Sequence, residues 1–231
     1  MEEIGLTHGG KLGDFYLALP IGSWIWKTTG KKIRWLLADW FAPFHKIESF
    51  LMLQPMTSRV SLVPVRGLEW GIGCHPWHWN PNEWGVKCGK YINLGYAGWP
   101  EGFASEWYAK CANIAGWDRD FVLELGPCEP TCDVMCTEHV GRPPYFGDDP
   151  RTGDVKYIDT KADILSQIRR FAVADERHCG YSSMAIAMEF ANVPFYLYAN
   201  PKINCRKNFF SLRPELITWV PSGFPQSCTK G

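Results

Sequence analysis

The sequence predicts an α/β fold made of two halves, each with its own parallel sheet. Short apolar runs alternate with helical patterns in the first third of the chain, and the same alternation restarts after a proline-containing stretch near residue 130. Strand, helix, strand in succession favours parallel strands joined by right-handed crossovers. The expected units are residues 1–125, a linker at 126–133 and residues 134–231.

In the first half, apolar runs of strand length alternate with longer helical patterns. Strands are expected at 4–10, 32–38 and 59–67, and helices at 13–31 and 40–55. Residues 68–102 contain five tryptophans and many glycines without helical periodicity, so a long aromatic insertion or loop is expected there. A helix and a short run follow up to Gly126, and Pro127 and Pro130 then indicate a hinge.

The second half repeats the alternation. Strands are expected at 133–141, 154–159, 176–182 and 193–200, and helices at 160–174 and 183–192. The segment 160–174 is strongly amphipathic, which is typical of a helix that covers one face of a sheet.

Composition narrows the functional classes. The chain has 231 residues, 46% of them hydrophobic, and its formal net charge is zero. This length is sufficient for substantial cores, and the neutral charge removes the basic excess that broad nucleic-acid binding needs. The sequence contains no run of eighteen apolar residues, so it predicts no membrane span. No secretory signal is evident either, so a cytoplasmic location is expected.

The nine cysteines do not indicate a disulfide framework, because their number is odd and their spacing irregular. Cys128, Cys132 and Cys136 follow one another at intervals of four, and His139 could complete a metal site. The neighbouring prolines oppose a regular helix there. Ordinary thiols in a loop and a strand are the favoured interpretation, and no metal is expected.

Two segments together resemble a known family. "THGGKLGDFYLALP" at 7–20 and "ADILSQIRRFAVADERHCGYSSMAIAMEFANVPFYLYANP" at 162–201 resemble the N-terminal and C-terminal motifs of the heptosyltransferase-type glycosyltransferases. In that family a glycine-rich turn precedes Gly-Asp and a helix with Leu-Pro, and a serine-containing turn precedes a small-residue helix. The resemblance implies a GT-B arrangement, two Rossmann-like halves facing a cleft, in a compact and divergent form.

The second motif departs from the family pattern. Asp-Ser-Gly and a following His are usual there, whereas this chain has Tyr181, Ser182, Ser183 and Ile186. Asn192 likewise replaces the glycine of Gly-x-Pro. The resemblance therefore does not identify the sugar or the way in which the protein binds it.

The resemblance implies transfer of a hexose or heptose from a nucleotide-sugar to an acceptor hydroxyl, with no metal or cofactor. Asp14 stands at the position of the family's catalytic base, although it could equally cap the first helix. Arg142 could neutralise the diphosphate or form a surface salt bridge, and Lys11 could meet a phosphate or be solvated. The expected donor-binding residues are Gly10, Lys11, Gly13, Arg142, Gly180, Tyr181, Ser182, Ser183 and Met184.

The expected acceptor-binding residues are His8, Gly9, Trp77 and Trp79. The acceptor would be a saccharide, a lipid-linked sugar or a hydroxymethylated nucleobase in DNA. Packing within the insertion is the favoured role of its tryptophans, and a strand-end hydrogen bond to backbone is slightly favoured for His8.

One carboxylate is left out of the expected site, and two other functions stay open. Glu189 is expected to be solvated, because its spacing from Pro194 differs from that of the family's ribose-binding carboxylate. The alternatives are another nucleotide-sugar enzyme, an epimerase or hydrolase, and a thiol-rich metal-binding module. The sequence gives no indication of the oligomeric state.

Overall fold

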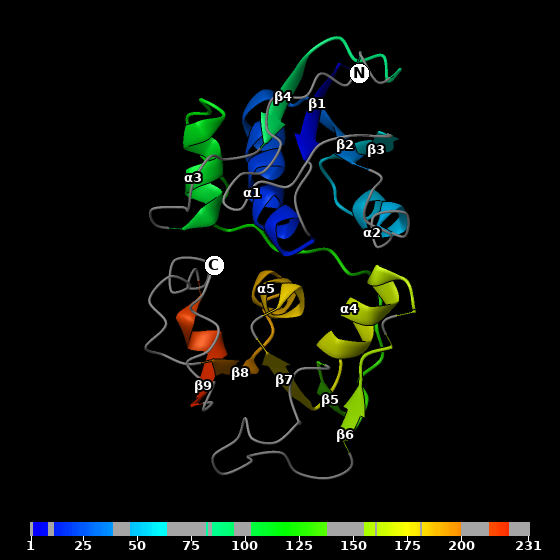
Figure 1. The fold of residues 1–231 in the computed structure, drawn as a ribbon, viewed down its shortest axis with the longest axis vertical. Coiled ribbons are helices and arrows are strands. Elements are labelled where there is room, and N and C mark those ends of the chain that lie inside the picture. Colours follow the sequence, from blue (N-terminus) through cyan, green and yellow to red (C-terminus); the bar gives the residue numbers. More distant parts are fainter. Residues whose placement is uncertain are drawn as a thin grey trace, which may run out of the picture.

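A computed structural model describes residues 2–8, 12–38, 47–63, 82, 85–94, 103–137, 155–159, 161–180, 182–199 and 213–221. These residues form two parallel sheets, one in each half of the chain, with helices packed between them (Figure 1). Within this part of the chain, no helix is both long enough and apolar enough to cross a membrane.

The first sheet has the strand order β3-β2-β1-β4, and every neighbouring pair is parallel. The order reverses between β1 and β4, as in the doubly wound sheets of nucleotide-binding proteins. The strands are β1 (Glu3–His8), β2 (Lys32–Ala38), β3 (Thr57–Val63) and β4 (Tyr91–Leu94), and the helices are α1 (Leu12–Thr29), α2 (Glu48–Met52) and α3 (Ala104–Cys111).

The second sheet has the order β6-β5-β7-β8-β9, again with parallel neighbours. Renumbered within this half, the order is 2-1-3-4-5, the flavodoxin-like variant of the doubly wound sheet, and it reverses between β5 and β7. The strands are β5 (Val134–Cys136), β6 (Val155–Tyr157), β7 (Glu176–Gly180), β8 (Phe195–Ala199) and β9 (Ile217–Pro221), and the helices are α4 (Ile164–Ala172), α5 (Ser183–Phe190) and the 3-10 turn η4 (Pro214–Leu216).

The predicted alternation of strands and helices is confirmed in both halves, with two corrections. Residues 91–94, expected within a loop, form β4, which pairs with β1 from Gly5↔Tyr91 to His8↔Leu94. The helix expected at 40–55 is observed only as α2, with residues 39–46 outside the described part, and a turn after Met52 leads to β3 from Thr57.

Helix α1 is buried along most of its length, because its sequence is apolar on every side. Its Pro20 leaves the helix unbroken, and the Pro20 carbonyl accepts a hydrogen bond from the Asp118 amide at 3.1 Å. The buried Asp118 carboxylate also accepts a hydrogen bond from Ser23 and lies 2.8 Å from Lys27 Nζ. The loop after α3 is therefore held against the middle of α1.

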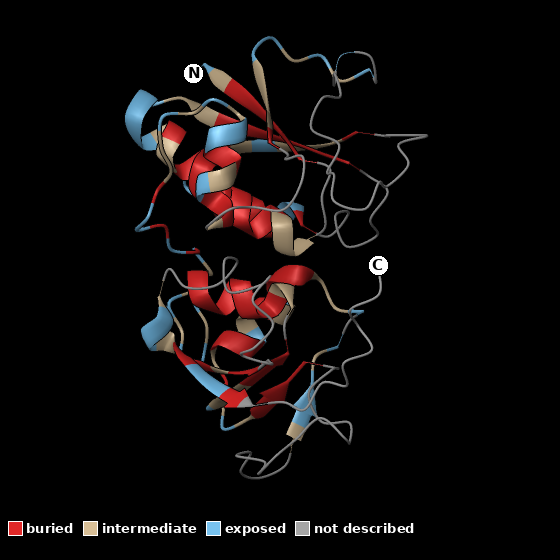
Figure 2. Cartoon of the chain, turned by 60° about the vertical axis from the view of Figure 1, so that its left-hand side comes forward, coloured by how far each residue is buried: buried red, intermediate tan, exposed pale blue. Residues whose placement is uncertain are grey.

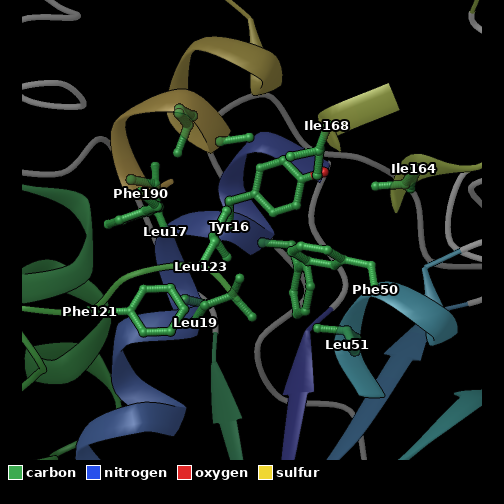
Figure 3. Packing of buried hydrophobic residues seen from close by; sticks show 14 of the residues in the cluster. Tyr16, Leu17, Leu19, Phe50, Leu51, Phe121, Leu123, Ile164, Ile168 and Phe190 are labelled. Carbon is green, nitrogen blue, oxygen red and sulfur yellow. The ribbon is translucent and has the colours of Figure 1, made fainter. Parts of the chain in front are cut away.

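The two halves share one apolar core. Burial is continuous from α1 across the junction to α4 and α5, as Figure 2 shows in red. Figure 3 shows the side chains that meet there, from α1, α2, the segment connecting the halves, α4 and α5. They include Tyr16, Leu17, Leu19, Phe50, Leu51, Phe121, Leu123, Ile164, Ile168 and Phe190, each at most 4% exposed.

Candidate functional site

The candidate site lies where the strand order of each sheet reverses. In the first sheet, β1 ends at His8 beside Leu94 of β4, and α1 begins four residues after His8. In the second sheet, β5 and β7 end at Cys136 and Gly180, and α5 begins at Ser183. Ligands of open parallel sheets bind at these carboxyl ends, so both sequence motifs occupy ligand-binding positions of their sheets.

The first turns of α1 and α5 lie against each other. A Cβ atom placed on Gly13 would be 3.4 Å from Ile186 Cδ1 and 3.5 Å from Ser183 Cα, which is ordinary van der Waals contact. Figure 1 shows the start of α1 beside α5 at the junction of the halves. The first amides of a helix have no carbonyl partner within that helix and lie at its positive dipole end, so the meeting of two helix starts favours an anion.

Ser182 is the N-cap residue of α5 and has an unusual hydroxyl. Its backbone is extended, with φ −144° and ψ 171°, and its side chain makes no capping hydrogen bond. The Ser182 Oγ atom is buried without a partner among the residues that the structure describes. An unsatisfied buried hydroxyl is costly, so this oxygen is suited to a ligand. The amides of Ser183 and Met184 begin the same helix turn.

The ends of β5 and β7 are held together by Thr137. The Gly180 amide donates a hydrogen bond to Thr137 Oγ1 at 2.9 Å, and the Thr137 amide donates to the His178 carbonyl at 3.0 Å. Thr137 thus fixes the end of β7, two residues before Ser182. The sequence interpretation missed this residue, although its place directly after the apolar run that forms β5 was a usable signal.

Asp14 lies in the first turn of α1, one residue after Gly13, and is partly exposed. The helix begins at Leu12, so Asp14 is its third residue rather than its cap. A carboxylate in this turn is stabilised by the helix dipole. Asp14 is therefore on the same short turn that contacts α5.

His8 is fully buried at the end of β1. Its Nε2 atom lies 3.1 Å from the Tyr108 hydroxyl of α3, and its ring meets the edge of Phe15 at 5.4 Å between centroids. The hydrogen bond expected at the strand end thus involves a tyrosine side chain. Tyr108, which sequence reasoning missed, holds the histidine at the end of β1.

Glu189 is buried, contrary to the expectation that it is solvated; it is 1% exposed. Its Oε1 atom accepts a hydrogen bond from the Arg213 amide at 2.9 Å, and the Arg213 guanidinium donates to the Glu189 carbonyl at 2.9 Å. The carboxylate therefore holds the segment before β9 against α5. The Arg213 contact explains its burial, because the amide compensates part of the desolvation.

The remaining expected site residues are Gly9, Gly10, Lys11, Trp77, Trp79, Arg142 and Tyr181, and all lie outside the described residues, as does His139. Of the three closely spaced cysteines, Cys136 is buried in β5, Cys128 is half-buried and Cys132 is exposed. Across the described ranges, no three side chains of His, Cys, Asp or Glu gather as metal ligands would.

Comparison with solved structures identifies similar folds. A family 9 glycosyl transferase from Veillonella parvula is similar with a TM-score of 0.56 at 12% identity, over 95% of this chain and 85% of that one. The iron-containing dodecameric glycosyltransferase TibC from enterotoxigenic E. coli gives 0.46 at 12% identity, over 85% of this chain and 58% of that one. No family model and no curated protein matches the sequence. The first likeness confirms the fold, an α/β chain with two Rossmann-like halves of the GT-B type.

Proposed function

We propose that this protein is a glycosyltransferase of the heptosyltransferase-like kind, which transfers a hexose or heptose from a nucleotide-sugar to an acceptor hydroxyl. The contact between Gly13 and the first turn of α5 carries the proposal, because it joins the two motifs of the predicted site. The fold shared with a family 9 glycosyl transferase supports it.

The start of α5 would bind the diphosphate of the donor. The Ser182 hydroxyl donates one hydrogen bond, the amides of Ser183 and Met184 donate two more, and the helix dipole stabilises the negative charge. This charge grows as the bond between the anomeric carbon and the diphosphate oxygen breaks. Interactions that strengthen at that moment lower the barrier to transfer.

Asp14 would act as the general base. Its carboxylate accepts the proton of the acceptor hydroxyl while that oxygen forms a bond to the anomeric carbon, and the nucleoside diphosphate leaves with the electron pair of the broken bond. The proposed acceptor is a saccharide, a lipid-linked sugar or a hydroxymethylated nucleobase in DNA. Neither chemical step requires a metal ion, in agreement with the transfer mechanism that the resemblance implies.

Donor binding tests the first part of the proposal. UDP-, GDP- and ADP-sugars are screened by thermal shift, and one class is expected to raise the Tm of the wild type. Ser182→Ala should raise the Kd of the donor roughly 10- to 150-fold, since a hydrogen bond to a charged group contributes roughly 1.5–3 kcal/mol. Ser166→Ala, in the first turn of α4, is the matched control and should leave donor binding unchanged. If no nucleotide-sugar stabilises the protein, the proposed function is wrong.

Turnover tests the second part. Asp14→Asn is expected to keep donor affinity and to lower kcat roughly 100- to 10,000-fold, as loss of a general base does. Asp120→Asn, at an exposed position, is the control. Unchanged turnover in Asp14→Asn would exclude Asp14 as the base. Product analysis separates transfer from the alternatives, because an epimerase or hydrolase consumes the donor without an acceptor.

A further inference from the structure

The segment Phe121–Thr131, here called the connecting segment, joins the two halves of the chain. Its start alternates buried and exposed side chains like a strand: Phe121 and Leu123 are buried, while Val122 and Glu124 are exposed. Phe121 and Leu123 enter the shared core, and the Phe121 ring meets Phe190 of α5 at 5.6 Å between centroids (Figure 3). The segment is therefore packed as part of the core.

Gln54 binds this segment to the first half. The Glu124 amide donates a hydrogen bond to Gln54 Oε1 at 3.1 Å, and Gln54 Nε2 donates to the Glu124 carbonyl at 2.9 Å. The glutamine thus pairs with both backbone groups of one residue, as a neighbouring strand would. Gln54 is 1% exposed, so water does not compete for these bonds.

The second half binds the same segment on its other side. The Leu123 amide donates a hydrogen bond to the Phe190 carbonyl at 2.9 Å, and Arg169 Nε of α4 donates to the Leu125 carbonyl at 2.6 Å. The Thr131 amide donates to the Val173 carbonyl at 3.0 Å, beyond Pro127 and Pro130. The bonds therefore lie on both sides of the stretch where the sequence indicates a hinge.

We infer that the connecting segment is a strap that holds the two halves in one fixed arrangement, with Gln54 as its attachment to the first half. A rotation of one half about this segment would break its bonds to Gln54 or to Phe190 and Arg169, and would expose Phe121 and Leu123. The contact between α1 and α5 therefore exists before any ligand binds. The inference concerns the protein alone and does not depend on the proposed function.

Native-state hydrogen exchange of the unliganded protein tests the strap. The amides of Leu123 and Glu124 are expected to exchange as slowly as strand amides such as that of Leu36. Gln54→Leu should speed exchange of the Glu124 amide tenfold or more relative to the Leu36 amide. Gln167→Leu is the matched control, because the Gln167 side chain donates to the Ala162 carbonyl beside its own helix, and it should leave the Glu124 amide unchanged.

Arg169→Gln provides a second variant if Gln54→Leu does not fold, with the Leu123 and Glu124 amides as reporters. Small-angle scattering then compares the radius of gyration of the wild type alone and with 5 mM UDP, GDP or ADP, and no change is expected. Fast exchange at Leu123 and Glu124 in the wild type, no response to either variant, or contraction with a nucleotide would overturn the inference.

Discussion

Gly22 shows how closely α1 approaches the first sheet. A Cβ atom at this position would lie 2.8 Å from Cζ2 and 3.0 Å from Cη2 of Trp35, whose ring is fully buried and hydrogen-bonded through Nε1 to Thr57. We expect Gly22→Ala to lower the free energy of unfolding by roughly 1–2 kcal/mol, because displacing the buried indole costs up to about 3 kcal/mol and alanine stabilises a helix by about 1 kcal/mol relative to glycine. Chemical denaturation measures the difference.

Gly89→Ala is the matched control for that substitution. Apart from its two chain neighbours, no described residue has an atom within 4 Å of a Cβ placed on Gly89, and Gly89 is exposed, so a change within about 0.5 kcal/mol is expected. Equal stability of the Gly22→Ala variant and the wild type would show that α1 can move away from β2.

Asp163 caps α4 and gives this helix a defined pH dependence. Its carboxylate accepts hydrogen bonds from the Ser166 hydroxyl at 2.6 Å and the Ser166 amide at 2.9 Å, and these bonds hold the pKa of Asp163 below its ordinary value. Because the pKa of this carboxyl is lower in the folded protein than in the unfolded chain, its ionisation stabilises the fold at pH values above the unfolded-state pKa of about 4. The stabilisation is lost as the pH falls through the folded-state pKa.

Asp163→Ala should therefore lower the free energy of unfolding by about 0.5–2 kcal/mol at pH 7, and the deficit should shrink below about pH 4. Urea denaturation of both proteins between pH 7 and pH 3 measures it. A deficit that is the same at every pH would mean that the ionised carboxylate does not cap the helix. Asp120→Ala, at an exposed position, should change stability little at any pH.

At the scale of single residues, the sequence predicts the role of a residue when that role depends on neighbours close to it in the chain. Asp14, Gly13 and Ser182 are expected in the site because each belongs to a short strand–turn–helix motif. The burial of Glu189 was not predicted, because it depends on Arg213, which is 24 residues away and follows a segment without a regular pattern. Local spacing contains no information about a partner that only the fold brings near.

At the scale of elements, length and composition decide which strands the sequence reveals. β1 and β2 are runs of six and seven residues, and their interior positions are apolar enough to be recognised. β4 has four residues, three of them only partly buried, within a region rich in glycine and tryptophan. It forms a strand because it pairs with β1, so its structure is imposed by tertiary contacts.

Helix α5 is connected to β9 by the Glu189–Arg213 pair, and this connection predicts a graded response. Glu189→Gln keeps an oxygen that can accept from the Arg213 amide, so a loss below about 1.5 kcal/mol in the free energy of unfolding is expected. Glu189→Ala leaves that partly buried amide without its acceptor and opens a cavity, so roughly 2–4 kcal/mol should be lost. Thermal denaturation compares the two variants, and equal losses would show that the hydrogen bond to Arg213 does not stabilise α5.

At the scale of the whole molecule, the sequence predicts the two sheets but not how their helices join. Each alternating series of strands and helices is visible along the chain, because apolar periodicity reports which residues are buried. The apolar circumference of α1 shows that this helix is covered on all sides, yet it does not show that α5 and α4 provide part of the cover. Which element covers a buried helix face is decided only when the two halves pack together.

The shared core predicts that stability lost in one half is lost in the other. Ile168 of α4 is fully buried beside residues of α1 and α2 (Figure 3). Ile168→Ala should lower the free energy of unfolding by roughly 2–5 kcal/mol, the cost of a large cavity in a core. Since the core spans the junction, hydrogen exchange should accelerate equally at the Leu6 amide in the first sheet and the Leu197 amide in the second.

The reciprocal substitution, Leu19→Ala in α1, separates shared from independent stability. If the halves unfold together, Leu19→Ala also accelerates exchange at the Leu197 amide, although Leu19 lies in α1 of the first half and Leu197 lies in β8 of the second sheet. If each half unfolds alone, Ile168→Ala affects Leu197 only and Leu19→Ala affects Leu6 only. The first pattern means that α1 stabilises both sheets through one core, so that a defect at the junction reaches the first turns of α1 and α5 together.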